Sequence, residues 1–138
     1  MVLEKAIVVA VEAHAGQVGK DGRPYILHPL HLMLQMETEV EMITAVLHDV
    51  VEDTAVTFAD LETMGFSMEA LAALRLLTHE DGVSYEAYVA AIKPHPLARR
   101  VKLADLEHNM DTRRIPHLQP KDLARLEKYH LAWEMLQE

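Results

Sequence analysis

The side chains best suited to chemistry gather in one stretch, Ala45 to Asp53. It reads A-V-L-H-D-V-V-E-D, with His48 and Asp49 adjacent, and an acid, Glu52 or Asp53, follows each of them four residues later. Because aliphatic residues fill the gaps, the spacing predicts a helix that buries one face and presents the four ionisable side chains on one wall. Such a wall is poorly solvated unless a positive charge lies among its members. A divalent metal would supply that charge, since neutral imidazole and carboxylate are both good metal ligands.

Glu52 and Asp53 also have a simpler explanation. They lie near the C-terminus of the expected helix, where solvated acids are ordinary. The adjacent His48 and Asp49 inside an apolar run are harder to explain in this way. Metal binding is therefore the hypothesis for this pair, and both interpretations stay open for the two acids.

Two other segments supply residues of the ligand type. His28 follows a Gly-rich loop, and Asp105 lies in V-K-L-A-D-L-E-H-N-M, with Asn109 one helical turn later on the same face. Together with His48 and Asp49 they give two imidazoles and two carboxylates. This donor set suits manganese, iron or zinc, whereas calcium and magnesium prefer sites made of oxygen alone.

Length and composition limit the class of protein. The 138 residues have room for a single domain, and half of them are hydrophobic, as in a globular protein. Cysteine is absent, so the chain has no disulfides and no thiolate chemistry. The formal charge of −9 argues against a nucleic-acid-binding surface. A phosphorylated small molecule stays possible if a metal and a few basic side chains concentrate positive charge locally.

Membrane insertion and export are not expected. No apolar run approaches the ~20 residues that span a bilayer, and the N-terminal M-V-L-E-K is no signal peptide. We therefore expect a cytoplasmic protein without a membrane partner. The sequence does not give the oligomeric state.

The elements that must position these residues are helical in pattern, and no alternating strand pattern of useful length occurs. The longest loop signal is the Gly-rich segment 16–25 before His28. The central helix is expected to begin near Thr38, whose hydroxyl can cap it together with Glu41. We predict one all-α bundle of about seven to eight helices, at residues 3–14, 30–35, 38–53, 57–65, 68–77, 84–92, 97–110 and 121–136.

Four sequence blocks carry a resemblance to a known family. In order, they are A-H-A-G-Q (13–17), D-G-R-P-Y-I-L-H-P (21–29), L-H-D-V-V-E-D-T (47–54) and V-K-L-A-D-L-E-H-N-M (101–110). The chain resembles an HD-domain metal-dependent phosphohydrolase. More narrowly, it resembles the hydrolase domain of the RelA/SpoT family, which removes pyrophosphate from guanosine tetraphosphate and pentaphosphate. The resemblance implies one compact HD domain over residues 1–138 without the family's synthetase domain, as in small stand-alone alarmone hydrolases.

The resemblance also implies roles for individual residues. Four of them would bind a divalent metal, expected to be Mn²⁺: His28, His48, Asp49 and Asp105. Glu52 and Asp53 match the acid pair that serves the hydrolytic step, and Asn109 matches a polar residue of the active site.

Three positions depart from the family pattern. A basic residue usually stands nine positions before the ligand histidine, where this chain has Gly19 followed by Lys20. Leu106 and Asp111 also replace basic residues of the family. All three positions could contact substrate, while the expected metal ligands are intact. Hydrolysis of a phosphate ester is therefore better supported than guanosine tetraphosphate as the substrate.

The candidates for substrate binding are Lys20, Arg23, Lys102 and Asn109. The first two lie in the loop before His28 and could hold phosphate oxygens, although an exposed loop would also solvate them. Lys102 lies one turn before Asp105, where it could contact phosphate or pair with an acid. His79, like several other histidines, has no partner at ligand spacing and is expected to be a surface or packing residue.

Three functions remain open. The first is a guanosine 3′,5′-bis(diphosphate) 3′-pyrophosphohydrolase. The second is an HD phosphohydrolase that acts on another nucleotide, such as a nucleoside monophosphate or a phosphorylated dinucleotide. The third is a non-catalytic module that binds a metal and a nucleotide. The acids Glu52 and Asp53 argue against the third function, because a purely structural metal site does not need them.

Overall fold

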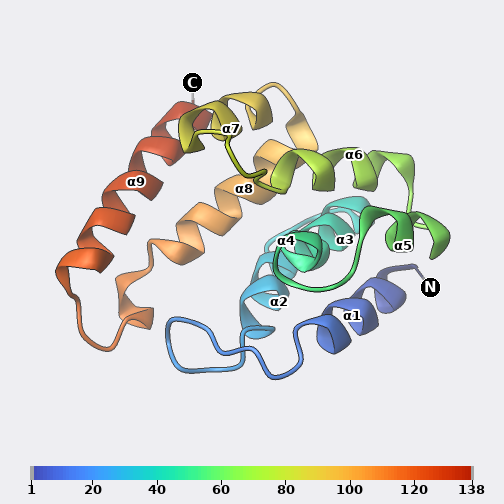
Figure 1. The fold of residues 1–138 in the computed structure, drawn as a ribbon, viewed down its shortest axis with the longest axis horizontal. Coiled ribbons are helices and arrows are strands. Elements are labelled where there is room, and N and C mark those ends of the chain that lie inside the picture. Colours follow the sequence, from blue (N-terminus) through green and yellow to red (C-terminus); the bar gives the residue numbers. More distant parts are fainter. Residues whose placement is uncertain (1, 138) are drawn as a thin grey trace.

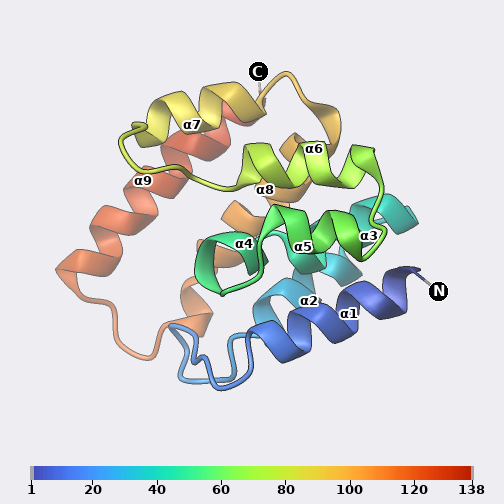
Figure 2. The ribbon, with the colours of Figure 1, turned by 45° about the vertical axis from the view of Figure 1, so that its right-hand side comes forward.

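The computed structural model describes residues 2–137, and their arrangement is entirely helical (Figures 1 and 2). Within this range the only strand-like feature is an isolated bridge between Val18 and Pro24. The all-α prediction is therefore confirmed. The elements are α1 (Val2–Ala13), α2 (Leu27–Leu34), α3 (Glu39–Leu47), α4 (Val50–Asp53), α5 (Phe58–Thr63), α6 (Met68–Leu77), α7 (Tyr85–Ile92), α8 (Pro96–Asn109), the 3-10 helix η1 (Thr112–Arg114) and α9 (Pro120–Gln137).

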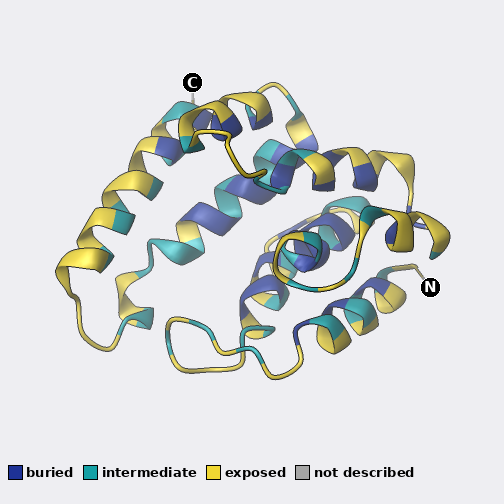
Figure 3. Cartoon of the chain, viewed as in Figure 1, coloured by how far each residue is buried: buried dark blue, intermediate teal, exposed yellow. Residues whose placement is uncertain are grey.

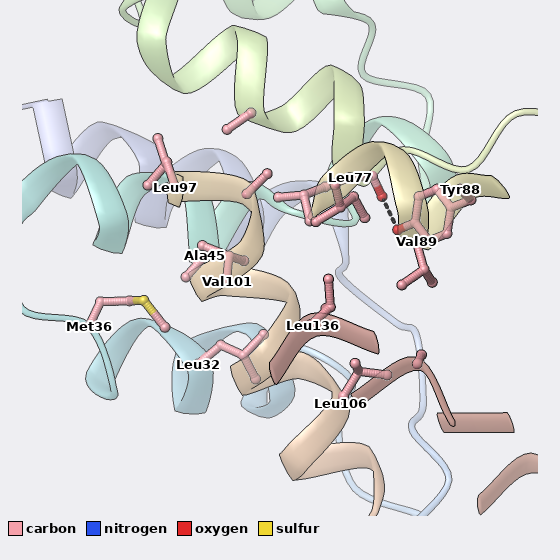
Figure 4. Close-up of a cluster of buried hydrophobic side chains, with 14 residues drawn as sticks. Leu32, Met36, Ala45, Leu77, Tyr88, Val89, Leu97, Val101, Leu106 and Leu136 are labelled. Carbon is pink, nitrogen blue, oxygen red and sulfur yellow. Dashed lines mark hydrogen bonds between the residues drawn. The ribbon is translucent and has the colours of Figure 1, made fainter. Parts of the chain in front are cut away.

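Two clusters of buried hydrophobic side chains hold the helices together. The first joins α2, α3, α6, α7, α8 and α9 (Figure 4), and the second joins α1 and α3 through α6. Met33 and Val40 pack against both clusters, so α2 and α3 connect them. Helix α8 crosses the middle of the molecule, and α9 lies on its outside with most of its surface exposed (Figure 3). The segments that carry the candidate ligands thus run through or beside the core.

Helix starts follow the capping residues of the sequence. Thr38 accepts a hydrogen bond from Glu41 N–H, and the Glu41 carboxylate accepts one from Thr38 N–H, which completes a capping box at α3. Thr57 forms the same arrangement at α5, and the hydroxyls of Ser67 and Ser84 cap α6 and α7. Each cap stabilises its helix by about 1 kcal/mol. The predicted starts of these helices are confirmed.

The central helix is not continuous, contrary to the single wall predicted for residues 45–53. α3 ends at Leu47, and α4 begins at Val50 after a turn. At the break the Ala45 carbonyl accepts the His48 backbone N–H at 3.4 Å and the His48 Nδ1 proton at 2.8 Å. That carbonyl would otherwise accept the N–H of Asp49, so a side chain competes with the helical ladder at this point. His48 and Asp49 consequently occupy a turn, in which His48 Nε2 lies near Asp105 of α8 and beside the Asp49 carboxylate.

Candidate metal centre and active site

The four predicted metal ligands come from three parts of the fold and meet at one place. His28 lies in the first turn of α2, His48 and Asp49 in the turn between α3 and α4, and Asp105 in α8. Asp105 Oδ1 lies 2.8 Å from His28 Nε2 and 3.5 Å from His48 Nε2. Asp49 Oδ2 lies 3.0 Å from His48 Nε2. His28, His48 and Asp105 are buried, and Asp49 is partly exposed.

The hydrogen bonds of His48 determine which of its ring atoms can bind a cation. Because the Ala45 carbonyl can only accept, the His48 Nδ1 must carry a proton. His48 Nε2 is buried and has no hydrogen-bond partner among the described residues, although two carboxylate oxygens are close. In a neutral ring this nitrogen has a lone pair directed at negative charge, an arrangement that a cation between them would stabilise.

The ring of His28 is held in a similar way by a residue of α8. Its Nδ1 lies 2.7 Å from His108 Nδ1, and the two rings stack. Burial and the nearby Arg114 charge lower the pKa of His108 to about 4, so the His108 ring is neutral near pH 7. A neutral His108 can accept the His28 Nδ1 proton, which leaves the His28 Nε2 lone pair free for a cation.

The two ligand carboxylates are also held by neighbours. The Tyr25 hydroxyl donates to Asp49 Oδ2. Lys102 Nζ donates to Asp105 Oδ2 at 2.9 Å, and Asn109 Nδ2 donates to Asp105 Oδ1 at 3.0 Å. Burial tends to raise the pKa of Asp105, but the Lys102 charge and the two imidazoles beside its carboxylate bring that pKa well below its usual range. Both carboxylates are therefore ionised at neutral pH, as metal ligands must be.

These residues fit a divalent cation. The ligand atoms of His28, His48 and Asp49 all lie within 4.8 Å of one another, and Asp105 Oδ1 is close to both histidines. Such spacings allow one ion to reach the donors of His28, His48 and Asp49 at ordinary coordination distances of about 2.0–2.3 Å, with Asp105 Oδ1 beside both imidazoles. The orphaned His48 Nε2 and the ionised carboxylates supply the required lone pairs and charge.

The expected catalytic acids lie beside this cluster on α4. Carboxylate oxygens of Asp49, Glu52 and Asp53 lie within 4.8 Å of one another, and the last two residues are exposed. Glu52 Oε1 accepts the backbone N–H of His79 at 2.7 Å. Partial burial and the charges of Asp49 and Asp53 raise the pKa of Glu52 despite that bond. Partial burial and the Asp49 charge also raise the pKa of Asp53.

A cavity of about 300 Å³ opens over the cluster and contains most of the predicted substrate-binding residues. Lys20, Lys102 and Asn109 line it, together with Glu52 and Asp53. Arg23 does not line it and instead borders a neighbouring cavity behind His28 and His108. Lys102 is buried, with its amine bonded to Asp105, so little of it faces the cavity.

Several residues of this cavity were not among the site residues predicted from the sequence. All four tyrosines of the chain line it, with His79, Arg114 and Lys128: Tyr25, Tyr85, Tyr88 and Tyr129. His79, expected to be a surface or packing residue, fixes Glu52 through its backbone N–H. The spacing of Tyr85 and Tyr88, three residues apart on one helix, was an available signal that α7 has an aromatic face. Nothing in the local sequence indicates that α9 turns Lys128 and Tyr129 toward a ligand cluster made by other helices.

Comparison with known proteins identifies relatives of the chain, although no family model matches it. It is 34% identical over 124 residues to the bifunctional (p)ppGpp synthase/hydrolase SpoT of Escherichia coli, a match covering 80% of this chain and 18% of the relative. It is 30% identical over 122 residues to the guanosine-3′,5′-bis(diphosphate) 3′-pyrophosphohydrolase of Aquifex aeolicus, covering 80% of this chain and 17% of that protein. The chain thus spans about a fifth of the length of these curated relatives.

A solved structure of a metazoan SpoT ortholog, described as hydrolysing ppGpp, has the same fold. The two superpose with a TM-score of 0.75 at 22% sequence identity, over 97% of this chain and 82% of that one. No described helix combines the length and hydrophobicity needed to cross a membrane. On the evidence of its sequence relatives and its fold, the chain is an HD-type helical domain similar to the RelA/SpoT proteins.

Proposed function

We propose that the chain is a metal-dependent phosphohydrolase that removes the 3′-pyrophosphate of guanosine 3′,5′-bis(diphosphate). The observation that carries the proposal is the convergence of two imidazoles and two carboxylates beneath a cavity lined by acids and lysines. The names of the relatives from E. coli and A. aeolicus support the reaction and the substrate.

His28, His48, Asp49 and Asp105 would hold the divalent metal. We propose Mn²⁺, because two nitrogen and two oxygen donors suit it better than magnesium or calcium. The cation supplies Lewis-acid polarisation of a phosphoryl oxygen and makes water a better nucleophile at neutral pH. The protein's own contribution is to fix the donor atoms through Tyr25, His108 and the Ala45 carbonyl.

Glu52 would orient the attacking water and accept its proton. The His79 N–H fixes one carboxylate oxygen, and the raised pKa makes Glu52 a stronger base than an ordinary glutamate. Asp53 would support that role or transfer a proton to the leaving oxygen. Because the two carboxylates are close, they titrate as a pair, and their roles are assigned jointly.

Lys20 and Asn109 would contact the phosphates. Lys20 Nζ donates to the Tyr129 hydroxyl at 3.1 Å and lies 4.9 Å from the centre of that ring, which holds the amine at the cavity. Among the described residues Lys20 forms no ion pair, so its charge is available to an anionic substrate. A protein with a net charge of −9 needs such local positive charge to attract a phosphorylated nucleotide.

A second substrate class is favoured by two of the departures from the family pattern. Leu106 is fully buried in the core, and Asp111 pairs with Arg113. Neither position presents a cation to the cavity, and Arg23 lies outside it. A phosphohydrolase that acts on a different nucleotide, such as a nucleoside monophosphate, is therefore the second candidate.

The test is a hydrolysis assay with Mn²⁺ and a panel that contains guanosine 3′,5′-bis(diphosphate) and nucleoside monophosphates. Release of pyrophosphate supports the first candidate, release of orthophosphate supports the second, and no release from any compound contradicts both. The His48→Ala variant should lose Mn²⁺ binding and turnover together. His130→Ala, which alters an exposed histidine on the outside of α9, is the control. Hydrolysis that survives His48→Ala would reject the metal centre.

A further inference from the structure

Lys102 is a buried cation beside the candidate metal centre. Only 9% of the residue is exposed, although lysine amines usually reach solvent. Its Nζ donates to Asp105 Oδ2 at 2.9 Å and lies 5.2 Å and 5.9 Å from the ring centres of Tyr88 and Tyr85. An amine enclosed in this way is poorly placed to bind a substrate phosphate.

The two oxygens of Asp105 have separate partners. Oδ2 accepts from Lys102, whereas Oδ1 faces His28 Nε2 and His48 Nε2 and accepts from Asn109 Nδ2. Only Oδ1 therefore lies among the candidate metal donors.

The enclosure around Lys102 is itself fixed. Tyr88 is buried, and its hydroxyl donates to the Leu77 carbonyl at 2.6 Å, a bond drawn in Figure 4. If the amine left, the Asp105 Oδ2 would remain buried without its charged partner. Losing one partner of a buried ion pair is costly, so the amine and Oδ2 are expected to stay together.

We propose that Lys102 is a positioning residue that restricts Asp105 to one ligand oxygen. The proposal rests on the metal centre of the proposed function. A carboxylate can bind a metal through one oxygen or through both, and the second oxygen would occupy a further coordination position. By holding Oδ2, Lys102 keeps that position open for water or a substrate oxygen, as a catalytic metal site requires.

The experiment compares Mn²⁺ bound to the wild-type protein and to Lys102→Met by electron paramagnetic resonance and by water proton relaxation. The variant should still bind Mn²⁺, because all four ligands remain. Six-coordinate Mn²⁺ with four protein donors has two open positions, so loss of one bound water should reduce the inner-sphere relaxation per bound ion about twofold. Equal relaxation in the two proteins would overturn the proposal.

Lys128→Met is the matched control. Lys128 Nζ lies 4.1 Å from the ring centre of the same Tyr85, but it forms no bond with a ligand carboxylate. The Lys128→Met substitution removes the same charge from the same cavity but leaves the bond between Lys102 and Asp105 in place. The water proton relaxation of this variant should therefore equal that of the wild type. A reduction as large as that of Lys102→Met would attribute the effect to charge alone and contradict the positioning role.

A structure of the wild-type protein with Mn²⁺ tests the same proposal without any substitution. It should show Asp105 Oδ1 alone coordinated and Oδ2 still bonded to Lys102. Coordination by both oxygens would overturn the proposal while leaving the proposed function intact. A wild-type protein that binds no Mn²⁺ would instead reject the metal centre, and with it both proposals.

Discussion

At the residue scale, the candidate metal ligands are each held in place by a hydrogen bond to a neighbouring group. His48 is fixed by a backbone carbonyl, His28 by His108, and Asp49 by the Tyr25 hydroxyl. In the two histidines the bond at Nδ1 leaves Nε2 directed at the cluster, whereas Tyr25 bonds the same Asp49 oxygen that lies beside His48 Nε2. Partners of this kind commonly change metal affinity or activity 10- to 100-fold when removed. The surrounding residues are therefore as much a part of the centre as the four donors.

Glu52→Gln tests the proposed base. A glutamine can keep the hydrogen bond from His79 N–H but cannot accept a proton from water. General base catalysis contributes about 10²- to 10⁴-fold, so kcat should fall by that factor while Mn²⁺ affinity changes little. Steady-state kinetics and a metal titration measure the two quantities.

Glu62→Gln is the control for this substitution, because Glu62 is exposed on α5 and does not line the cavity. It should leave kcat unchanged. A Glu52→Gln variant with wild-type kcat would exclude Glu52 as the base.

At the element scale, the helix boundaries could largely be predicted because capping residues define them locally. Thr38, Thr57, Ser67 and Ser84 each accept a backbone N–H three residues later, as their types and spacing indicated. The break between α3 and α4 could not be predicted in this way. At the break the His48 ring bonds the Ala45 carbonyl through Nδ1 and faces Asp105 of α8 through Nε2. Asp105 is distant in the sequence, so local spacing does not predict this arrangement.

The residues that line the cavity could also be predicted only in part. His28, His48, Asp49 and Asp105 could be proposed because their residue types and the resemblance pointed to metal binding. The contribution of α9 could not be predicted, because the packing of α9 on α7 and α8 and the bond with Lys20 place Tyr129 at the cavity. Lys102 was expected to contact substrate from its position one turn before Asp105. Its amine is enclosed by tyrosines of α7, a contact that sequence spacing does not encode.

Thr38→Ala tests the role of the cap at α3. The substitution removes one half of the capping box that begins the helix leading to His48. The free energy of unfolding should fall by about 1 kcal/mol, measured by urea denaturation of the metal-free protein. Thr63→Ala, at the exposed last residue of α5, should change it by less than about 0.5 kcal/mol. Equal effects from the two substitutions would mean that the cap adds nothing specific.

At the scale of the whole molecule, the candidate metal centre connects helices that belong to both hydrophobic clusters. His28 and Asp105 lie on α2 and α8, while Asp49 lies at the start of α4, next to Val50 of the second cluster. A cation shared by these ligands would stabilise the folded chain as a unit, because unfolding separates the donors. Metal binding and global stability should therefore be linked.

Removing the metal should lower the melting temperature, and the difference should grow with pH. At a free Mn²⁺ concentration of 100 times Kd, binding adds about 2.7 kcal/mol, or roughly 8 °C for a chain of this size. In the metal-free protein burial lowers the pKa of His48, but the Asp49 charge and the nearby Asp105 carboxylate raise it well above 6.5 overall.

The stability that this raised pKa gives to the metal-free protein is complete below pH 6.5 and is lost as the pH rises through the folded pKa. Mn²⁺ must displace the same proton, so its apparent affinity rises over that range. Thermal denaturation with Mn²⁺ or with a chelator, at pH 6 and pH 8, should therefore give the larger difference at pH 8. His48→Ala should show no difference at either pH. A wild-type difference that shrinks with rising pH would contradict a centre built on His48.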